Sequence, residues 1–201
     1  MSAPESAHGF ANPMPAGLCS LATICFGLFA VMTGQVSHAA MPILAVWCVG
    51  GFLIQAVAAW IEFKEQNQTG SNLFLVFACF FMLVTAGSIF SKYFLKAAGM
   101  PFDSTVEGWL WIAPMLWVLA AVLTFLKRPS SLFILGIVLL AALPAMIVLD
   151  MGLAIDRKAW ATFLGWDLFV AACIATYIAF GLTVNLGFGK PIVPLGNPII
   201  K

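Results

Sequence analysis

The chain has 201 residues, of which 63% are hydrophobic and 8% charged, with a net charge of +1. Soluble domains carry about 25% charged residues, so a soluble enzyme and a disordered tail are excluded. The nearly neutral balance also leaves no basic face for nucleic acid, and the composition predicts a chain that lies in the lipid bilayer.

Six long apolar stretches, separated by charged and turn-forming residues, follow along the chain. A membrane helix needs about 20 apolar residues to cross about 30 Å, whereas strands of a β-barrel would alternate apolar and polar residues. The sequence therefore predicts an all-α membrane protein, a bundle of six transmembrane helices. We expect an N-terminal tail over 1–16, a transmembrane domain over 17–183 and a C-terminal tail over 184–201. The predicted spans are 17–35, 43–62, 72–91, 109–126, 132–149 and 161–183.

A helix start precedes the first span. Asn12 is a strong N-cap residue, and Pro13 and Pro15 suit a first helical turn because its N–H groups have no helical partner. The free amides at such an end attract anions. Asn12 is therefore either an ordinary helix start or part of an anion-binding site.

Small and weakly polar residues recur along the first span at a spacing that keeps them on one helix face. Two interpretations are open. Such a face lets helices pack closely in lipid, or it lines a narrow water-filled path to which Ser20 and Thr23 contribute. The residues of this face are Ser20, Thr23, Gly27, Ala30 and Gly34.

The second, third and sixth spans carry similar stripes, so a bundle that turns them inward would surround a pore. Gln55 lies well inside the second span, with Glu62 on the same face. A buried amide must find hydrogen-bond partners, so Gln55 either joins two helices or offers donors to a solute. The stripes of the third and sixth spans are Ala78, Thr85, Ser88 and Lys92, and Ala172, Thr176, Ala179 and Thr183.

Prolines and tryptophans mark the later spans. Pro114 and Pro144 fall inside the fourth and fifth spans and should kink them. Six tryptophans near span ends predict an aromatic belt at the membrane surface. These are Trp47, Trp60, Trp109, Trp111, Trp160 and Trp166.

Charge is rare inside the spans. Asp167 lies about two turns into the sixth span, and an ionised carboxylate at mid-membrane costs at least ~2.5–3.5 kcal/mol. We therefore assign Asp167 and Glu62 a candidate role in moving protons or ions. The five cysteines lie in spans without a C-x-x-C pair, and neither of the two histidines lies in a span. No metal or cofactor site is predicted, and no pair of histidines or carboxylates at depth suggests an enzyme.

The distribution of Lys and Arg in the loops sets the expected topology. One side of the membrane holds one basic residue more than the other, which favours both termini in the cytoplasm. That side has Lys64, Lys127, Arg128, Lys190 and Lys201, and the opposite side has Lys92, Lys96, Arg157 and Lys158.

Three segments in order resemble those of the acetate/succinate transporter family, which includes bacterial succinate–acetate permeases and the yeast acetate and ammonia-export proteins. The first, Asn-Pro-Met-Pro-Ala-Gly-Leu at 12–18, is similar to the signature Asn-Pro-Ala-Pro-Leu-Gly-Leu, with Met14 and Ala16 as departures. The stretch 55–64 resembles the family's Gln-(x)6-Glu-Tyr-Lys, and 188–196 resembles its Phe-Gly-Arg-x-x-x-Pro-x-Gly ending.

The resemblance implies a fold and a set of site residues. Its members are six-helix bundles assembled as hexamers, with a path for small carboxylates through each protomer. A hydrophobic constriction at the middle of the path maps onto Leu21, Phe77 and Leu139, with Ala175 nearby. Leu21 stands where some relatives have Phe, and Phe77 where they have Tyr. Gln55 and Asn12 match polar positions of the family.

The predicted function is a passive or proton-linked path for acetate-sized monocarboxylates, and for succinate, in the inner or plasma membrane. Asn12, Ser20, Thr23 and Gln55 would replace part of the water shell of the acid. Two alternatives stay open at this point. One is a channel for ammonia, ammonium or another small solute such as urea, and the other is a structural or sensory membrane protein. The expected partners are the carboxylate, the bilayer and, in a homo-hexamer, further copies of the chain.

Overall fold

The structure is a computed structural model that describes residues 9–200, and it consists of helices joined by short loops. Six helical spans are long and apolar enough to cross a membrane, so the predicted all-α bundle of six spans is confirmed. The spans are Met14–Met32, His38–Lys64, Gln68–Ala97, Thr105–Lys127, Ser130–Asp150 and Arg157–Phe188.

Four spans are essentially single helices: α1 (Met14–Met32), α2 (Met41–Lys64), α7 (Ser130–Asp150) and α8 (Arg157–Phe188), with a short 3₁₀ turn η1 (His38–Ala40) before α2. The third and fourth spans are composite. The third joins α3 (Gln68–Val76), a π-helical segment η2 (Phe77–Val84) and α4 (Thr85–Ala97). The fourth joins α5 (Thr105–Leu110), α6 (Ile112–Thr124) and a 3₁₀ turn η3 (Phe125–Lys127).

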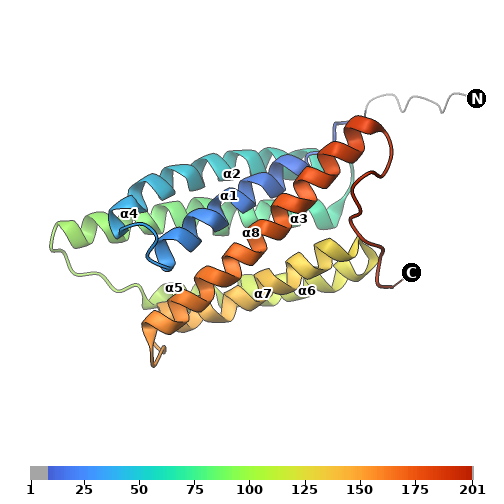
Figure 1. The fold of residues 1–201 in the computed structure, drawn as a ribbon. Coiled ribbons are helices and arrows are strands. Elements are labelled where there is room, and N and C mark those ends of the chain that lie inside the picture. The colour runs from blue at the N-terminus through green and yellow to red at the C-terminus, as the bar shows by residue number, and fades with distance from the viewer. Residues whose placement is uncertain (1–8, 201) are drawn as a thin grey trace, which may run out of the picture.

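The helices form two groups that α8 connects. In Figure 1, α1 to α4 lie side by side in the upper part of the view and α5 to α7 in the lower part. The long α8 runs obliquely across both groups and packs against α1 and α7. The second span packs against α1, α3, η2 and α4. This arrangement brings α1, the third span, α6 and α7 around a common space.

Side chains and glycines define several helix ends. Asn67 begins α3 by accepting a hydrogen bond from the Gly70 N–H at 3.2 Å, and Asp156 begins α8 by accepting one from the Ala159 N–H at 3.0 Å. Gly189 ends α8 with φ of 62°, a left-handed conformation that glycine adopts without a steric cost. These caps place the loops at the two ends of the bundle.

The fourth span is interrupted, although not at its proline. The regular helix breaks at Trp111, three residues before Pro114. Pro114 has no N–H to donate to the carbonyl of Leu110, so the chain turns there and resumes as α6. Pro144 differs, because α7 continues through it as one helix.

Helix α4 is longer than the sequence predicts. The expected third span ended at residue 91, which left Lys92 and Lys96 in a loop. In the structure both lysines belong to α4, which ends at Ala97. Lys92 is thereby fixed on a helix and faces the fourth span, with which it makes an ion pair.

The chain after α8 folds back onto the bundle. Asn185 accepts hydrogen bonds from the N–H groups of Ile192 and Val193, and the N–H groups of Ile199 and Ile200 bond to the carbonyl of Leu126. Gly196 adopts φ of 83° against Ser130, where a Cβ atom would lie 1.9 Å from the serine Oγ. The final glycine of the stretch 188–196 therefore fits a position that excludes a side chain.

Candidate functional site

A narrow cavity opens at one end of the bundle between α1, the third span, α6 and α7. Its volume is about 70 Å³, and one water needs about 10–15 Å³ on this measure. The cavity thus has room for a few waters or for one solute with few non-hydrogen atoms. Its wall is mostly apolar and includes Leu18, Leu73, Phe74, Val118, Leu132 and Leu135.

The mouth of the cavity carries its polar side chains. Asn67, Thr69 and Arg128 line it, from the start of the third span and the end of the fourth. Asn67 bridges two charged groups, because its Nδ2 donates to Glu62 Oε2 at 2.5 Å and its Oδ1 accepts from Arg128 Nη2 at 3.3 Å. The mouth therefore presents a cation to solution, with the carboxylate of Glu62 buried behind the amide.

Gln55 brings a polar group deeper into the cavity. It lies on α2, is only 1% exposed and donates from Nε2 to the Gly17 carbonyl at 3.3 Å. Its Oε1 is buried and has no hydrogen-bond partner among the described residues. A buried polar atom of this kind costs free energy unless a partner reaches it. Because Gln55 lines the cavity, that partner can be a molecule inside it.

Gly17 permits the close packing of α1 against the third span. A Cβ atom at this position would lie 2.3 Å from the ring of Phe74, a distance that real contacts do not reach. The glycine of the signature at 12–18 therefore lets the Phe74 ring approach the α1 backbone. Met14, Gly17 and Leu18 of this signature line the cavity.

The cavity ends at Leu21, Phe77 and Leu139. The first and third spans and α7 all start at the mouth, and these are the lining residues farthest from it along each of the three. Leu21 is 8% and Phe77 5% exposed, and Leu139 is half-buried. The structure thus brings together three positions that the sequence linked only through a family resemblance.

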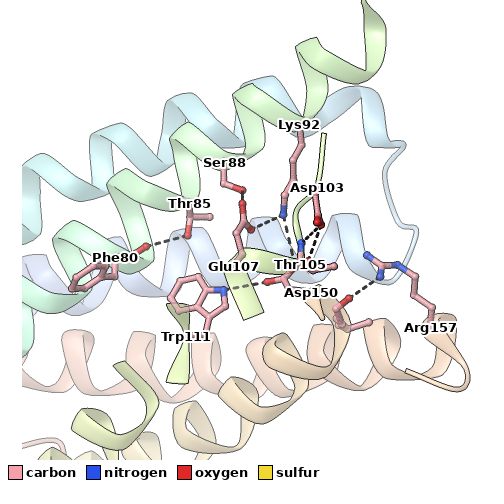
Figure 2. Close-up of polar contacts among 11 residues, drawn as sticks. Phe80, Thr85, Ser88, Lys92, Asp103, Thr105, Glu107, Trp111, Asp150 and Arg157 are labelled. Carbon is pink, nitrogen blue, oxygen red and sulfur yellow. Dashed lines mark hydrogen bonds and ion pairs between the residues drawn. The ribbon is translucent and has the colours of Figure 1, made fainter. Parts of the chain in front are cut away.

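Phe77 opens the π-helical segment η2. A π-helix holds one extra residue per turn and occurs frequently at functional sites. At the exit of η2, the Thr85 hydroxyl donates to the carbonyl of Phe80, five residues earlier, at 3.3 Å (Figure 2). The wide turn brings Phe77 and Phe81 into a stack with a ring separation of 4.4 Å.

An aromatic column fills the bundle beyond the constriction. The ring of Phe81 lies between Phe77, at 4.4 Å, and Trp111, at 5.1 Å. Trp111 is 8% exposed, so its predicted place in the aromatic belt at the membrane surface is wrong. The break in the fourth span turns this side chain inward, and the column closes the end of the bundle opposite to the mouth.

A charged cluster surrounds the end of this column (Figure 2). The Lys92 ammonium lies 2.6 Å from Glu107 Oε2 and 3.7 Å from Asp150 Oδ1. The Ser88 hydroxyl donates to Glu107 Oε1 at 2.6 Å, and Trp111 Nε1 donates to Asp150 Oδ2 at 3.1 Å. Since every charged group here has a partner of opposite charge or a hydrogen bond, the cluster can lie at the edge of the membrane.

Two neighbours of the cluster fix the start of the fourth span. Asp103 accepts hydrogen bonds from the N–H and the hydroxyl of Thr105, and these two bonds hold the pKa of its carboxyl below the usual range. Gly108 lies so close to α7 that a Cβ atom there would be 2.3 Å from the Met151 side chain. Both contacts keep Glu107 and Trp111 beside the end of α7.

Six of the predicted site residues lie outside the cavity lining, the four described here and the two acidic residues Glu62 and Asp167. Asn12 is exposed and precedes Pro13, which is the N-cap residue of α1, so the predicted N-cap role of Asn12 is wrong by one residue. Its Oδ1 still accepts from the N–H of Met14, the first residue of the helix, at 2.9 Å. Ser20 is buried and bonds to the Gly17 carbonyl at 2.9 Å. Thr23 is exposed and bonds to the Cys19 carbonyl at 2.9 Å. Ala175 is fully buried in α8.

The two predicted acidic residues have different surroundings. Glu62 is buried beside the mouth and is held by Asn67. Asp167 is half-buried on α8, and its Oδ2 has no hydrogen-bond partner among residues 9–200. Glu62 therefore touches the mouth of the cavity indirectly, and Asp167 lies apart from the lining.

Little in the sequence pointed to the residues at the two ends. Arg128 entered only the topology count, as one of two neighbouring basic residues between α6 and α7. Its neighbour Asn67 is 61 residues away along the chain, so no local pattern joins them. For Trp111 one signal existed, because the proline three residues later predicts a local break.

The fold and the cavity define a multi-pass helical membrane protein with a solute-sized space that opens at one end and ends at apolar side chains. A solved structure described as the bacterial acetate channel SatP has this fold, with a TM-score of 0.80 and 21% identity. The match covers 93% of this chain and 99% of that one.

The chain belongs to the GPR1/FUN34/yaaH family, whose model matches residues 1–188. It is 25% identical over 191 residues to the succinate-acetate/proton symporter SatP of Escherichia coli and to that of Shigella flexneri. Each match covers 93% of this chain and 96% of the relative. The family membership inferred from the three sequence segments is therefore confirmed.

Proposed function

We propose that the protein is a membrane channel or permease for small carboxylic acids such as acetate, with succinate as a further substrate. The observation that supports this best is the single cavity that joins Gln55 to Leu21, Phe77 and Leu139. The relatives named after acetate and succinate support the substrate class. The proposal involves movement of the solute and no chemical reaction.

Arg128 attracts the acid to the mouth. Its guanidinium is exposed, bonds only to a neutral amide and has no carboxylate within 4.0 Å among the described residues. A cation at the mouth of a cleft raises the local concentration of anions. Because the Arg128 guanidinium and the approaching anion are both exposed to water, their attraction weakens as the salt concentration increases.

Gln55 favours the acid in its neutral form inside the cavity. An ionised carboxylate loses much of its hydration in an apolar space, and it would face the partial negative charge of Gln55 Oε1. A protonated acid donates its O–H to that oxygen instead. Gln55 therefore fits a path in which a proton crosses together with the carboxylate.

The three apolar side chains at the end of the cavity act as the gate. Hydrophobic constrictions stop ions and water by dewetting. A small neutral acid with a methyl group loses less hydration free energy than an ion does when it passes such a ring of side chains. The width between Leu21, Phe77 and Leu139 then limits the size of the acid.

Assembly and topology complete the proposal. Large apolar side chains cover the outside of α2, among them Ile43, Trp47, Leu53 and Val57, and this surface suits lipid or further copies of the chain. We propose a homo-hexamer in the inner or plasma membrane with both termini in the cytoplasm. The slight excess of basic residues on the side of the termini supports this orientation.

Counterflow of labelled acetate in proteoliposomes, with and without a pH gradient, tests the function. We expect protein-dependent acetate exchange above that of protein-free vesicles, faster when the inside is alkaline. Competition by unlabelled succinate, ammonium and urea identifies the solute class. Competition by ammonium or urea but not by acids would favour the channel for small nitrogen compounds, and absence of protein-dependent acetate exchange would contradict the proposal.

A further inference from the structure

The aromatic column links the constriction to the opposite end of the bundle. Phe77 forms part of the constriction and stacks on Phe81, and Phe81 packs on Trp111. The indole N–H of Trp111 bonds to Asp150 at 3.1 Å. A continuous set of contacts therefore runs from the side chain that ends the cavity to the charged cluster shown in Figure 2.

Trp111 occupies a position that only the local break makes available. It is buried, whereas Trp109, two residues earlier in the same span at the end of α5, is 68% exposed. The interruption before Pro114 and the close approach of Gly108 to α7 set the direction of the indole. The ring is thus held by the backbone on one side and by a hydrogen bond on the other.

The cluster holds the acceptor of that hydrogen bond. Asp150 comes from the end of α7, Lys92 from α4 and Glu107 from α5, so three helices meet at this point. Arg157, at the start of α8, donates to the carbonyl of Leu149 beside Asp150 at 2.8 Å. Lys92 is shared by both carboxylates, and the Asp150 carboxylate is therefore fixed in place.

We infer that Trp111 is the positioning residue of the gate: held by Asp150 and Lys92, it supports Phe81 and so keeps the Phe77 ring across the end of the cavity. The inference rests on the proposed function in one respect, since it takes the constriction to select the solute. It adds that the size limit of the path is set partly from the far end of the bundle. Loosening Trp111 then lets the Phe77 ring move although no residue that lines the cavity has been substituted.

Variants of Trp111 and Phe81 test the column. Trp111→Ala removes the support, Trp111→Phe keeps a ring but loses the N–H, and Phe81→Leu interrupts the stack in the middle. We expect Trp111→Ala to raise the ratio of butyrate flux to acetate flux about tenfold, the change that corresponds to the loss of one aromatic pair. Phe81→Leu should change the ratio in the same direction, and Trp111→Phe should change it less.

Variants of Asp150 test the anchor and separate positioning from folding. Asp150→Asn retains an oxygen that accepts from the indole N–H, whereas Asp150→Leu has a similar size and no acceptor. The ratio of butyrate flux to acetate flux should stay near that of the wild type in Asp150→Asn and should rise in Asp150→Leu. Trp109→Ala is the matched control, because it removes an exposed ring from the same span. A ratio of two fluxes is independent of the amount of folded protein.

Osmotic water permeability of the same vesicles gives a second readout that needs no assumption about the solute. A displaced Phe77 ring admits water. In a stopped-flow measurement, vesicles that contain Trp111→Ala or Asp150→Leu should therefore shrink faster than vesicles that contain the wild type. An unchanged flux ratio and unchanged water permeability in both variants would overturn the inference. If the wild type carries no acetate, the proposed function fails, and the water measurement still decides the role of Trp111.

Discussion

The two ends of the bundle are built differently. At the mouth, Arg128 lines the cavity with an exposed guanidinium that bonds to a neutral amide, and the cavity continues inward from it. At the far end, Lys92 and two carboxylates are paired, and aromatic rings fill the interior. One end is suited to receive a solute and the other is closed by its own side chains.

A chain with so few charges thus uses them in two ways. Paired charges at the far end join three helices and hold the Trp111 ring in place, which is a structural use. On the cavity side, Arg128 at the mouth has no carboxylate partner and Gln55 Oε1 deeper in the cavity has no hydrogen-bond partner among the described residues, so both groups are available to a solute. The boundary between the two regions is Phe77.

Removal of the Phe77 ring should have the largest effect on transport. In Phe77→Ala the ring at the end of the cavity is lost, and we expect butyrate flux to rise about tenfold or more, the range that one hydrocarbon group in an apolar pocket controls. Flux in proteoliposomes measures it. Phe80→Ala is the control, because Phe80 belongs to the same π-helical segment and is 45% exposed. Equal fluxes in the two variants would remove Phe77 from the gate.

Filling the space beside the mouth should lower the flux instead of raising it. Gly17→Val places a side chain where even a Cβ atom would be 2.3 Å from Phe74, so the Phe74 ring must move toward the cavity. Overpacking of this kind costs about 1–3 kcal/mol, and acetate flux should fall. Gly50→Ala is the control, since nothing lies within 4 Å of its Cβ position. Thermal unfolding in detergent and flux measure both effects, and a fully active Gly17→Val would contradict the packing argument.

A change of charge at the mouth should have a smaller effect. Arg128→Gln removes the cation, and we expect acetate flux at low ionic strength to fall about threefold, with the difference lost at high salt. Lys127→Gln, a neighbour outside the cavity lining, is the matched control. The salt dependence of initial rates is the measurement. A deficit that persists in high salt would indicate a structural role for Arg128 instead of attraction.

Asn12 should have the smallest effect on transport. Because its Oδ1 accepts from the first N–H of α1 and the residue lies outside the cavity lining, Asn12→Ala should cost about 1 kcal/mol of stability and leave the flux per folded protein unchanged. Asn12→Ser, which keeps a side-chain acceptor, should restore the stability. A strong loss of flux in Asn12→Ala at unchanged stability would return this residue to the path, as the sequence alone suggested.

The sequence predicted the spans because each depends on about 20 consecutive apolar residues, a local property. It also predicted that Gln55 would be buried and in need of a partner. The constriction was different, since Leu21, Phe77 and Leu139 are ordinary apolar residues in apolar helices and only the family resemblance singled them out. Composition and spacing contain no signal that separates them from their neighbours.

Features that depend on contacts between distant segments were missed. Arg128 and Asn67 meet across 61 residues, and Lys92 of α4 meets Asp150 at the end of α7. The burial of Trp111 followed from the position of a break, whereas the belt rule considers only the distance from a span end. The π-helical segment also had no local signal, because all of its residues are apolar and suit an α-helix equally.

The wide turns of η2 give the third span a tolerance to a change in its length. A π-helical turn takes up one residue more than an α-helical turn, so deletion of a single codon within residues 77–84 can be absorbed when η2 becomes an ordinary α-helix, and Ser88 and Lys92 keep facing Glu107. The same deletion within residues 85–87 has no such turn to absorb it. Each residue of an α-helix turns the chain by about 100°, so Ser88 and Lys92 would there rotate away from Glu107 although the span stays long enough to cross the bilayer.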